Sequence, residues 1–242
     1  MIDYVMPLFS SMHEITADGP HEEIQLLAID FCTMLFETMY IIPGYRDWYK
    51  ANDHTRTYNY LRMALQVLQW QNHGDRRWVL KSPQHLEQFR PLLAAFPDAR
   101  IIQTHRDPVR ITASLCTMVA YTQRMNTSVI DPWVIGHYWG NRIEDLLRAS
   151  VEDRRLLPED QVLDIRFHEY MADQISMVER VYEFVGQPMT DVAARAIRTF
   201  KDANPKGKHG RILYRLEDFG LDPDERREAL RFYQEFFDIP EE

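Results

Sequence analysis

Three polar side chains in one short segment have the types and the spacing of an anion site. Arg106, Arg110 and Ser114 follow one another at intervals of four residues, which is the spacing of one helix face. Asp107-Pro108 is a typical helix start, because a capping side chain precedes a proline at the first helical position. Arg106 therefore stands at the entrance of a predicted helix. A planar guanidinium fork with a nearby hydroxyl suits a phosphate dianion, so the segment predicts a phosphate site.

Charge is distributed unevenly along the chain, which agrees with an anion site. The 242 residues include 28 basic and 37 acidic side chains, for a formal charge of −9. Residues 75–110 nevertheless carry seven basic residues against four acids, and residues 201–215 carry five against one. A local positive field can hold a phosphate despite an opposite net charge. A nucleic-acid partner is not expected, because its usual footprint is a broad basic face on a basic protein.

The elements that must position these side chains follow from the hydrophobic pattern. Apolar residues, Phe31 among them, recur at helical spacing over 24–39 and again within 53–72, so the first seventy residues are predicted to be helical. Three short apolar runs follow, at 78–80, 101–104 and 162–165. Their alternation with helices is typical of βα units on a parallel sheet. The pattern predicts one α/β domain over residues 1–242, with a helical segment 1–75 and an α/β part 76–242.

Three helix starts are marked by a capping side chain before a proline. They are Ser82-Pro83, Asp107-Pro108 and Asp222-Pro223, the last with Glu225 in the place of a capping box. These pairs locate the beginnings of three helices to within a residue or two. Lys81 and Arg106 each stand directly before such a start.

Several classes of protein are not expected from the composition. The apolar run from Ile24 to Phe36 contains Asp30 and is shorter than the ~20 residues of a membrane span. The first residues lack the basic and apolar regions of a secretory signal, and Cys32 and Cys116 are too few for a disulfide scaffold. The sequence contains no motif typical of a metal site. We therefore expect a cytoplasmic protein without a membrane span and without a bound metal.

The motifs of this chain, taken in order, resemble those of the sulfotransferase family. The runs that carry the resemblance are Arg77-Trp78-Val79-Leu80-Lys81-Ser82-Pro83, Phe96-Pro97-Asp98-Ala99, and Thr104-His105-Arg106-Asp107-Pro108 followed by Ser114. The resemblance implies transfer of a sulfuryl group from 3′-phosphoadenosine 5′-phosphosulfate (PAPS) to a hydroxyl or amine of a small-molecule acceptor. It also implies a helix-rich, P-loop NTPase-like parallel sheet flanked by helices. Within that family's pattern, Arg106 and Ser114 match the residues that hold the 3′-phosphate.

A second stretch resembles the final basic nucleotide loop of the same family. Pro205-Lys206-Gly207-Lys208-His209-Gly210 is followed by Tyr214 and by Glu217-Asp218-Phe219-Gly220-Leu221. By resemblance, Lys206, Gly207 and Lys208 close over the 3′-phosphate, since glycine permits a close backbone approach and lysines supply charge. His168, after the last predicted strand, matches an adenine-stacking aromatic residue of the family. Residues 76–242 are thereby expected to form the nucleotide-binding part.

One motif of the family has no counterpart in this sequence. The family's 5′-phosphosulfate loop is a Pro-Arg-Ser-Gly-Thr-Thr-like turn, and none of the nine glycines here is followed by Thr-Thr or Lys-Ser. We expect the P-loop strand to be missing and the chain to match the later part of a longer sulfotransferase. Backbone N–H groups of that loop would cradle the phosphosulfate, so transfer by this chain alone is expected to be impaired. Unpaired sheet edges would also allow a homo-oligomer.

Four residues are candidates for the chemistry itself. Lys81 matches a family lysine beside the transferred group, where it would stabilise oxygens that gain charge. His85 could remove the acceptor proton, because an imidazole titrates near neutrality. Glu22 and Glu23 are rival bases, since some branches of the family use a glutamate, and they also suit the first turn of a helix. The sequence leaves the identity of the base open.

Two functions remain open at this level. The first is a PAPS-dependent sulfotransferase or its catalytic remnant, and the second is a non-catalytic module that retains nucleotide binding, or only the fold, and serves an interaction role. The acceptor does not follow from the fold. Trp133, Tyr138 and Trp139 are candidates for an acceptor pocket, although aromatic residues on a helix are usually core.

Overall fold

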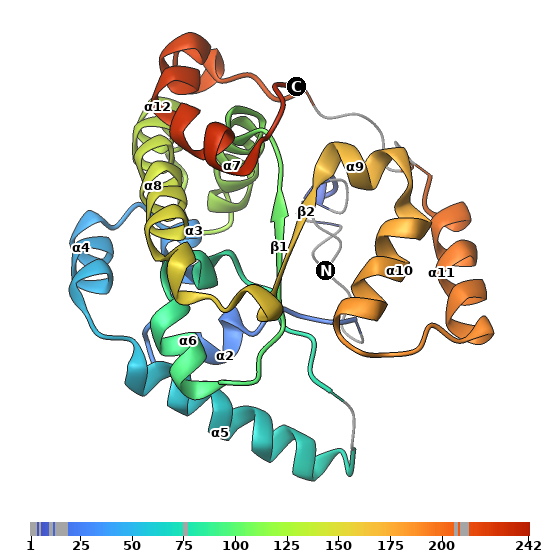
Figure 1. Cartoon of the computed structure of the whole chain (residues 1–242). Coiled ribbons are helices and arrows are strands. Elements are labelled where there is room, and N and C mark those ends of the chain that lie inside the picture. Colours follow the sequence, from blue (N-terminus) through green and yellow to red (C-terminus); the bar gives the residue numbers. More distant parts are fainter. Residues whose placement is uncertain are drawn as a thin grey trace.

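Two parallel strands lie in the middle of a helix-rich computed structural model of the chain (Figure 1). The structure describes residues 4, 6–9, 12, 19–74, 77–205, 208 and 213–242. Figure 1 shows helices α3, α4, α6, α7, α8 and α12 on one side of the strands and helices α9 to α11 on the other, with α5 along the bottom of the view. Within the described residues, no helix combines the length and the apolar character needed to cross a membrane.

The first stretch of helical spacing is divided into two short helices. Helix α2 spans Ile24–Ile29 and helix α3 spans Leu35–Met39. In the turn between them Phe31 adopts a φ of 58° and is 71% exposed, so its prediction as part of a continuous apolar face is wrong. The Tyr45 hydroxyl donates to the Phe31 carbonyl at 2.9 Å, and the Gln84 carboxamide accepts a backbone N–H of the turn at 3.0 Å. Residues outside the segment therefore decide where the helix breaks.

Two longer helices follow the turn. Helix α4 spans Pro43–Ala51 and helix α5 spans Thr55–Gln71, which confirms the helix predicted within 53–72. Leu61 and Leu65 of α5 are buried and pack against Leu27 of α2. This contact joins the long helix to the segment that begins just after Glu22 and Glu23.

The sheet contains two strands among the residues that the structure describes. Strand β1 (Ile101–His105) and strand β2 (Val162–Arg166) pair in parallel over their whole length, which confirms two of the predicted strands. The third predicted strand, 78–80, is extended but pairs with neither of them, and Val79 is 92% exposed. The prediction of a sheet strand there is wrong for the described chain, because an apolar run becomes a strand only where a neighbour exchanges backbone hydrogen bonds with it.

The main core lies between three helices beside β1. Helices α7 (Pro108–Gln123), α8 (Pro132–Glu152) and α12 (Pro223–Phe237) share a cluster of buried side chains that includes Val109 and Leu230. Two predicted helix starts are confirmed here: the Asp107 carboxylate accepts the Val109 N–H at 2.9 Å, and Asp222 caps α12 in the same way. The cap at Asp107 fixes the helix that begins next to Arg106.

The remaining elements are short. They are η2 (Pro83–Glu87), α6 (Phe89–Ala95), η3 (Asp153–Leu156), η4 (Glu159–Gln161), α9 (Phe167–Ala172), α10 (Gln174–Phe184), α11 (Asp191–Ala203) and η5 (Glu217–Phe219). The helix predicted after Ser82 is the single 3₁₀ element η2, capped by the Ser82 hydroxyl through the Gln84 N–H at 3.2 Å. Element η5 packs closely on α8, where a Cβ at Gly136 would lie 2.1 Å from the Phe219 carbonyl oxygen.

Candidate functional site

The structure brings Lys81 together with both candidate glutamates and with His85. Lys81 ends the extended segment before Ser82, and the two glutamates directly precede α2. The Lys81 ammonium forms an ion pair with Glu22, while the Lys81 backbone N–H donates to Glu23 Oε2 at 2.9 Å. Glu23 Oε1 lies 2.6 Å from His85 Nε2. One lysine thus holds neighbouring glutamates through two different groups.

The two glutamates have different environments although they are adjacent in sequence. The Glu23 side chain is 2% exposed, whereas that of Glu22 is 21% exposed and its partner Lys81 is 71% exposed. Burial by itself would raise the pKa of Glu23, but the hydrogen bond and charge of His85 and the Lys81 N–H outweigh it and lower the pKa. Glu23 is therefore a buried carboxylate at neutral pH, and the partly buried Glu22 forms its pair with the exposed Lys81.

Tyr58 extends this arrangement into the core. Its hydroxyl lies 2.7 Å from His85 Nδ1, and its side chain is fully buried on α5. Burial, with the charge of Glu23 as a second cause, raises the pKa of Tyr58 well above its ordinary value, so the phenol keeps its proton. A carboxylate can only accept, so His85 Nε2–H donates to Glu23, while Nδ1 shares a hydrogen bond with the Tyr58 hydroxyl.

This hydrogen-bond chain bears on His85 as a candidate base. Both ring nitrogens have partners inside the protein, Glu23 on one side and Tyr58 on the other. A base needs a free lone pair within reach of the proton it removes, so His85 would have to leave Tyr58 before it could act. The more exposed groups of this site are the Lys81 ammonium and the Glu22 carboxylate, which form an ion pair.

Arg106 directly follows the carboxyl end of β1. Its Nε and Nη2 donate to the Glu242 carboxylate at 2.9 and 2.7 Å, and its guanidinium carbon lies 4.2 Å from the ring centroid of Phe167. The hydrogen bonds that Arg106 donates to the Glu242 carboxylate are the largest cause that raises the pKa of Arg106. The guanidinium fork is oriented by an aromatic face and occupied by an anionic group of the protein itself.

The other predicted donor-site residues are not joined to Arg106 by hydrogen bonds in the described part of the chain. Ser114 is half-buried on α7, and His168 is exposed on α9 next to Phe167. Lys208 is exposed, and its ammonium donates to Asn204 at 2.9 Å. Lys206 and Gly207 lie outside the described residues. Their assignment to the nucleotide remains a prediction from the family resemblance.

Sequence reasoning missed three residues that contact the predicted ones. Tyr58 lies within the stretch 53–72, of which only a helix was predicted, Phe167 is the neighbour of the predicted His168, and Glu242 lies 136 positions from Arg106. Only for Phe167 was there a signal, since it is an aromatic residue directly after a strand end. The other two contacts depend on how distant helices pack.

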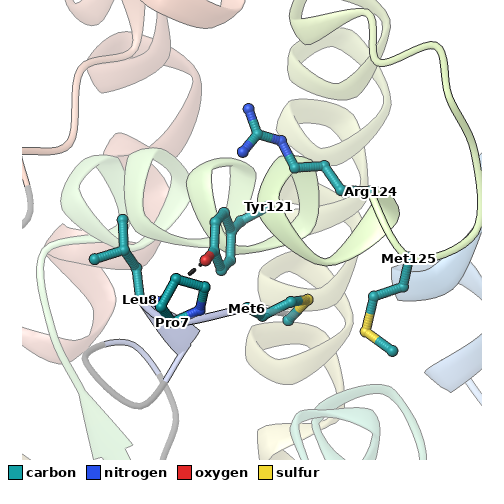
Figure 2. Close-up of a pocket in the computed structure, with 6 residues that line it drawn as sticks. All are labelled: Met6, Pro7, Leu8, Tyr121, Arg124 and Met125. Atoms are coloured by element: carbon teal, nitrogen blue, oxygen red, sulfur yellow. Dashed lines mark hydrogen bonds between the residues drawn. The ribbon is translucent and has the colours of Figure 1, made fainter. Parts of the chain in front are cut away.

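A pocket of about 300 Å³ lies elsewhere, between α7 and the segment of residues 6–8. Figure 2 shows Tyr121 of α7 and Arg124, directly after this helix, on one side of the pocket and Met6, Pro7 and Leu8 on the other. The Tyr121 hydroxyl accepts the Leu8 N–H at 3.1 Å. The lining is mainly apolar with one guanidinium at its edge, and none of the predicted site residues belongs to it.

The aromatic residues of α8 do not form an acceptor pocket. Trp139 is fully buried in the core, and the buried Tyr138 hydroxyl donates to Glu37 at 2.8 Å. Trp133 is 63% exposed, and its ring lies against Gly220. The aromatic run therefore serves packing, and its interpretation as an acceptor pocket is wrong for Tyr138 and Trp139.

Comparison with known proteins agrees with the arrangement of these motifs. The model of the sulfotransferase family matches residues 3–191. The structure is similar to that of sulfotransferase STF9 from Mycobacterium avium, with a TM-score of 0.83 and 28% identity over 94% of this chain and 58% of that one. It is also similar to sulfotransferase STF1 from Mycobacterium tuberculosis H37Rv, with a TM-score of 0.78 and 27% identity over 94% of this chain and 61% of that one.

Two further facts define the extent of this likeness. No curated protein matches the sequence. The chain spans about three fifths of the length of the two solved sulfotransferases. The matched residues nevertheless include Glu22, Lys81, His85, Arg106 and Ser114. The family match covers well over half of the chain, and this protein therefore belongs to the sulfotransferase family.

Proposed function

We propose that this chain binds the nucleotide of PAPS and takes part in transfer of its sulfuryl group to a hydroxyl or amine of a small-molecule acceptor. The observation that carries the proposal is the Lys81–Glu22 pair, held from beneath by the buried Glu23 carboxylate. A cation and a carboxylate side by side at the surface are the two groups that an in-line transfer needs: one for the oxygens that gain charge and one for the proton.

In this mechanism Glu22 is the base and Lys81 stabilises the transferred group. The acceptor oxygen attacks sulfur and forms a new S–O bond, while the S–O bond to the 5′-phosphate breaks and the phosphate leaves with the electron pair. The acceptor proton passes to the Glu22 carboxylate. When the donor is bound, the Lys81 ammonium turns from Glu22 to the sulfuryl oxygens, where it stabilises the charge that they gain.

Glu23, His85 and Tyr58 have a positioning role in this proposal. Glu23 accepts the backbone N–H of Lys81 and so fixes the end of the segment that presents the ammonium. His85 and Tyr58 in turn hold the other carboxylate oxygen of Glu23 in place. None of these three groups needs to touch the acceptor.

The donor nucleotide is assigned to the site around Arg106. Arg106, oriented by Phe167, would bind the 3′-phosphate with Ser114, and the Lys206–Lys208 loop would close over it. His168 is proposed to lie against the adenine, since it is exposed beside Phe167. These assignments rest on the family pattern and on the guanidinium fork of Arg106.

Titration calorimetry with adenosine 3′,5′-bisphosphate tests the donor site. We expect binding to this chain, and Arg106→Ala should weaken it by about 1.5–3 kcal/mol, the scale of a hydrogen bond to a charged group. Arg62→Ala is the matched control, because Arg62 is an exposed arginine on α5 that belongs to neither candidate site. Equal losses in both variants would mean that only general charge matters, and no binding at millimolar nucleotide would refute the proposal.

Transfer itself is tested with labelled PAPS and a panel of alcohols, phenols and amines. The assay compares this chain with a fusion that carries the 5′-phosphosulfate loop region of a solved relative. Lys81→Ala and Glu22→Gln should each abolish turnover while leaving bisphosphate affinity unchanged. Nucleotide binding without transfer by either protein would favour the second candidate function, a non-catalytic nucleotide-binding module; the Glu242–Arg106 pair, which already neutralises the donor-site cation, is the observation in its favour.

A further inference from the structure

An anionic side chain of the protein, Glu242, forms an ion pair with Arg106, the cation of the proposed donor site. The Glu242 carboxylate accepts from both Nε and Nη2 of Arg106, at 2.9, 3.1 and 2.7 Å. This is the paired geometry with which a guanidinium also binds a phosphate. The carboxylate therefore takes the hydrogen bonds that the 3′-phosphate would require.

The segment that carries Glu242 is held in place without this ion pair. The Ile239 side chain is 7% exposed in the core beside α12. The Glu242 N–H donates to the fully buried carboxylate of Asp107 at 2.9 Å, and Arg227 binds the same carboxylate at 3.1 Å. Because the backbone is anchored by these contacts, the Glu242 carboxylate is presented to Arg106 at a high effective concentration.

We propose that Glu242 competes with the 3′-phosphate for Arg106 and so determines how strongly this site distinguishes a 3′,5′-bisphosphate from a 5′-monophosphate. The inference rests on the proposed donor site. A nucleotide with a 3′-phosphate gains its contact with Arg106 only by displacing the carboxylate or by approaching a like charge. A nucleotide without that phosphate leaves the pair intact and is bound as if Glu242 were neutral.

The size of the effect follows from the exposure of the pair. The Arg106 and Glu242 side chains are 41% and 27% exposed, so solvent screens much of their attraction, and exposed pairs of this kind contribute little. Because Glu242 accepts from two nitrogens of Arg106, we expect this pair to contribute more than an exposed pair with a single contact. Removing the carboxylate should therefore raise the affinity for the bisphosphate about threefold to tenfold, and tenfold corresponds to about 1.4 kcal/mol.

The test is calorimetry with two nucleotides on three proteins. The nucleotides are adenosine 3′,5′-bisphosphate and adenosine 5′-phosphate, and the proteins are the wild type, Glu242→Gln and Glu241→Gln. Glu241 is the matched control, because it is the adjacent glutamate, 70% exposed, and its ion pair is with Arg227 instead of Arg106. Glutamine keeps the size of the side chain and the backbone N–H to Asp107.

We expect Glu242→Gln to bind the bisphosphate about threefold to tenfold more tightly, with the monophosphate changed by less than about twofold, and Glu241→Gln to match the wild type for both. Unchanged or weaker bisphosphate binding by Glu242→Gln, with measurable binding by the wild type, would overturn this inference alone and would show that Glu242 only orients Arg106. An equal gain for both nucleotides would also overturn it. No bisphosphate binding by any of the three proteins would overturn the donor site and this inference together.

Discussion

Arg142 is the residue whose replacement should most destabilise the fold around the Lys81 site. Its side chain is fully buried on α8, between Glu37 of α3 and Glu87 at the end of η2. It donates to Glu37 Oε2 at 3.1 Å and to Glu87 Oε2 at 2.8 Å. Burial alone would lower the pKa of Arg142, but the two carboxylates outweigh it and raise the pKa. Arg142 thereby joins η2, which carries His85, to the helical core.

The charges of this cluster predict unequal effects for its members. Arg142→Met leaves two buried carboxylates without a cation, and breaking a buried pair in this way costs about 3–5 kcal/mol, a large part of a typical ~5–15 kcal/mol stability. Glu37→Gln instead leaves one cation with one carboxylate. Its amide oxygen can still accept from Tyr138, which now donates to Glu37 at 2.8 Å. The expected loss for Glu37→Gln is within about 1 kcal/mol, the net scale of one hydrogen bond.

Urea unfolding followed by circular dichroism checks this prediction. We expect the midpoint to fall strongly for Arg142→Met and slightly for Glu37→Gln, with an unchanged slope. Arg142→Lys should fall between them, because an ammonium keeps the charge but cannot serve two carboxylates with paired donors. A loss below about 1 kcal/mol for Arg142→Met, or an equal loss for Glu37→Gln, would refute the reasoning that the buried cation balances this cluster.

Three further predictions concern single contacts. Tyr58→Phe removes the partner of His85 Nδ1 without leaving a large cavity and should cost about 1–2 kcal/mol in urea unfolding; ¹⁵N spectra of His85 should lose the wild-type Nδ1 shift, and an unchanged shift would contradict the contact. The folded pKa of Glu23 lies below its ordinary value of 4.5, so its stabilisation is present above that value and is lost as pH falls through the folded pKa. The stability difference between the wild type and Glu23→Gln should therefore shrink as the pH falls below about 4.5; a difference that grows below that pH would reverse the assignment. Gly136→Ala should lower the thermal midpoint by several degrees, since its Cβ would lie 2.1 Å from the Phe219 carbonyl oxygen, and an unchanged midpoint would show that η5 can move away.

Local chemistry explains what could be predicted from the sequence about the elements. The helix start at Asp107 was predicted because a carboxylate next to its own helix can bond the Val109 N–H without help from the rest of the chain. Strands β1 and β2 were predicted from short apolar runs, and the extended run at 78–80 was predicted in the same way but has no strand partner. Strand identity depends on a neighbour that the run itself does not contain.

For the candidate site, too, the short motifs could be predicted from the sequence and the contacts between distant segments could not. The order of the runs that contain Lys81 and Arg106 was sufficient to indicate the family, because each motif is a short run of residues. Which glutamate is more exposed was not predictable, since Glu22 and Glu23 are adjacent and their burial depends on how α2 lies against the segment before Ser82.

The sequence by itself determined the type of site: the cations, their spacing along the chain, and the helix and strand ends that carry them. The tertiary structure decided which of those groups are available. Packing of α5 directs Tyr58 to Nδ1 of His85, while Glu23 holds Nε2, so both imidazole nitrogens have partners. The segment after α12 delivers Glu242 to Arg106 across 136 positions of sequence. Hydrogen bonds and ion pairs act only over a few ångströms, so contacts between distant segments exist only once the helices have packed.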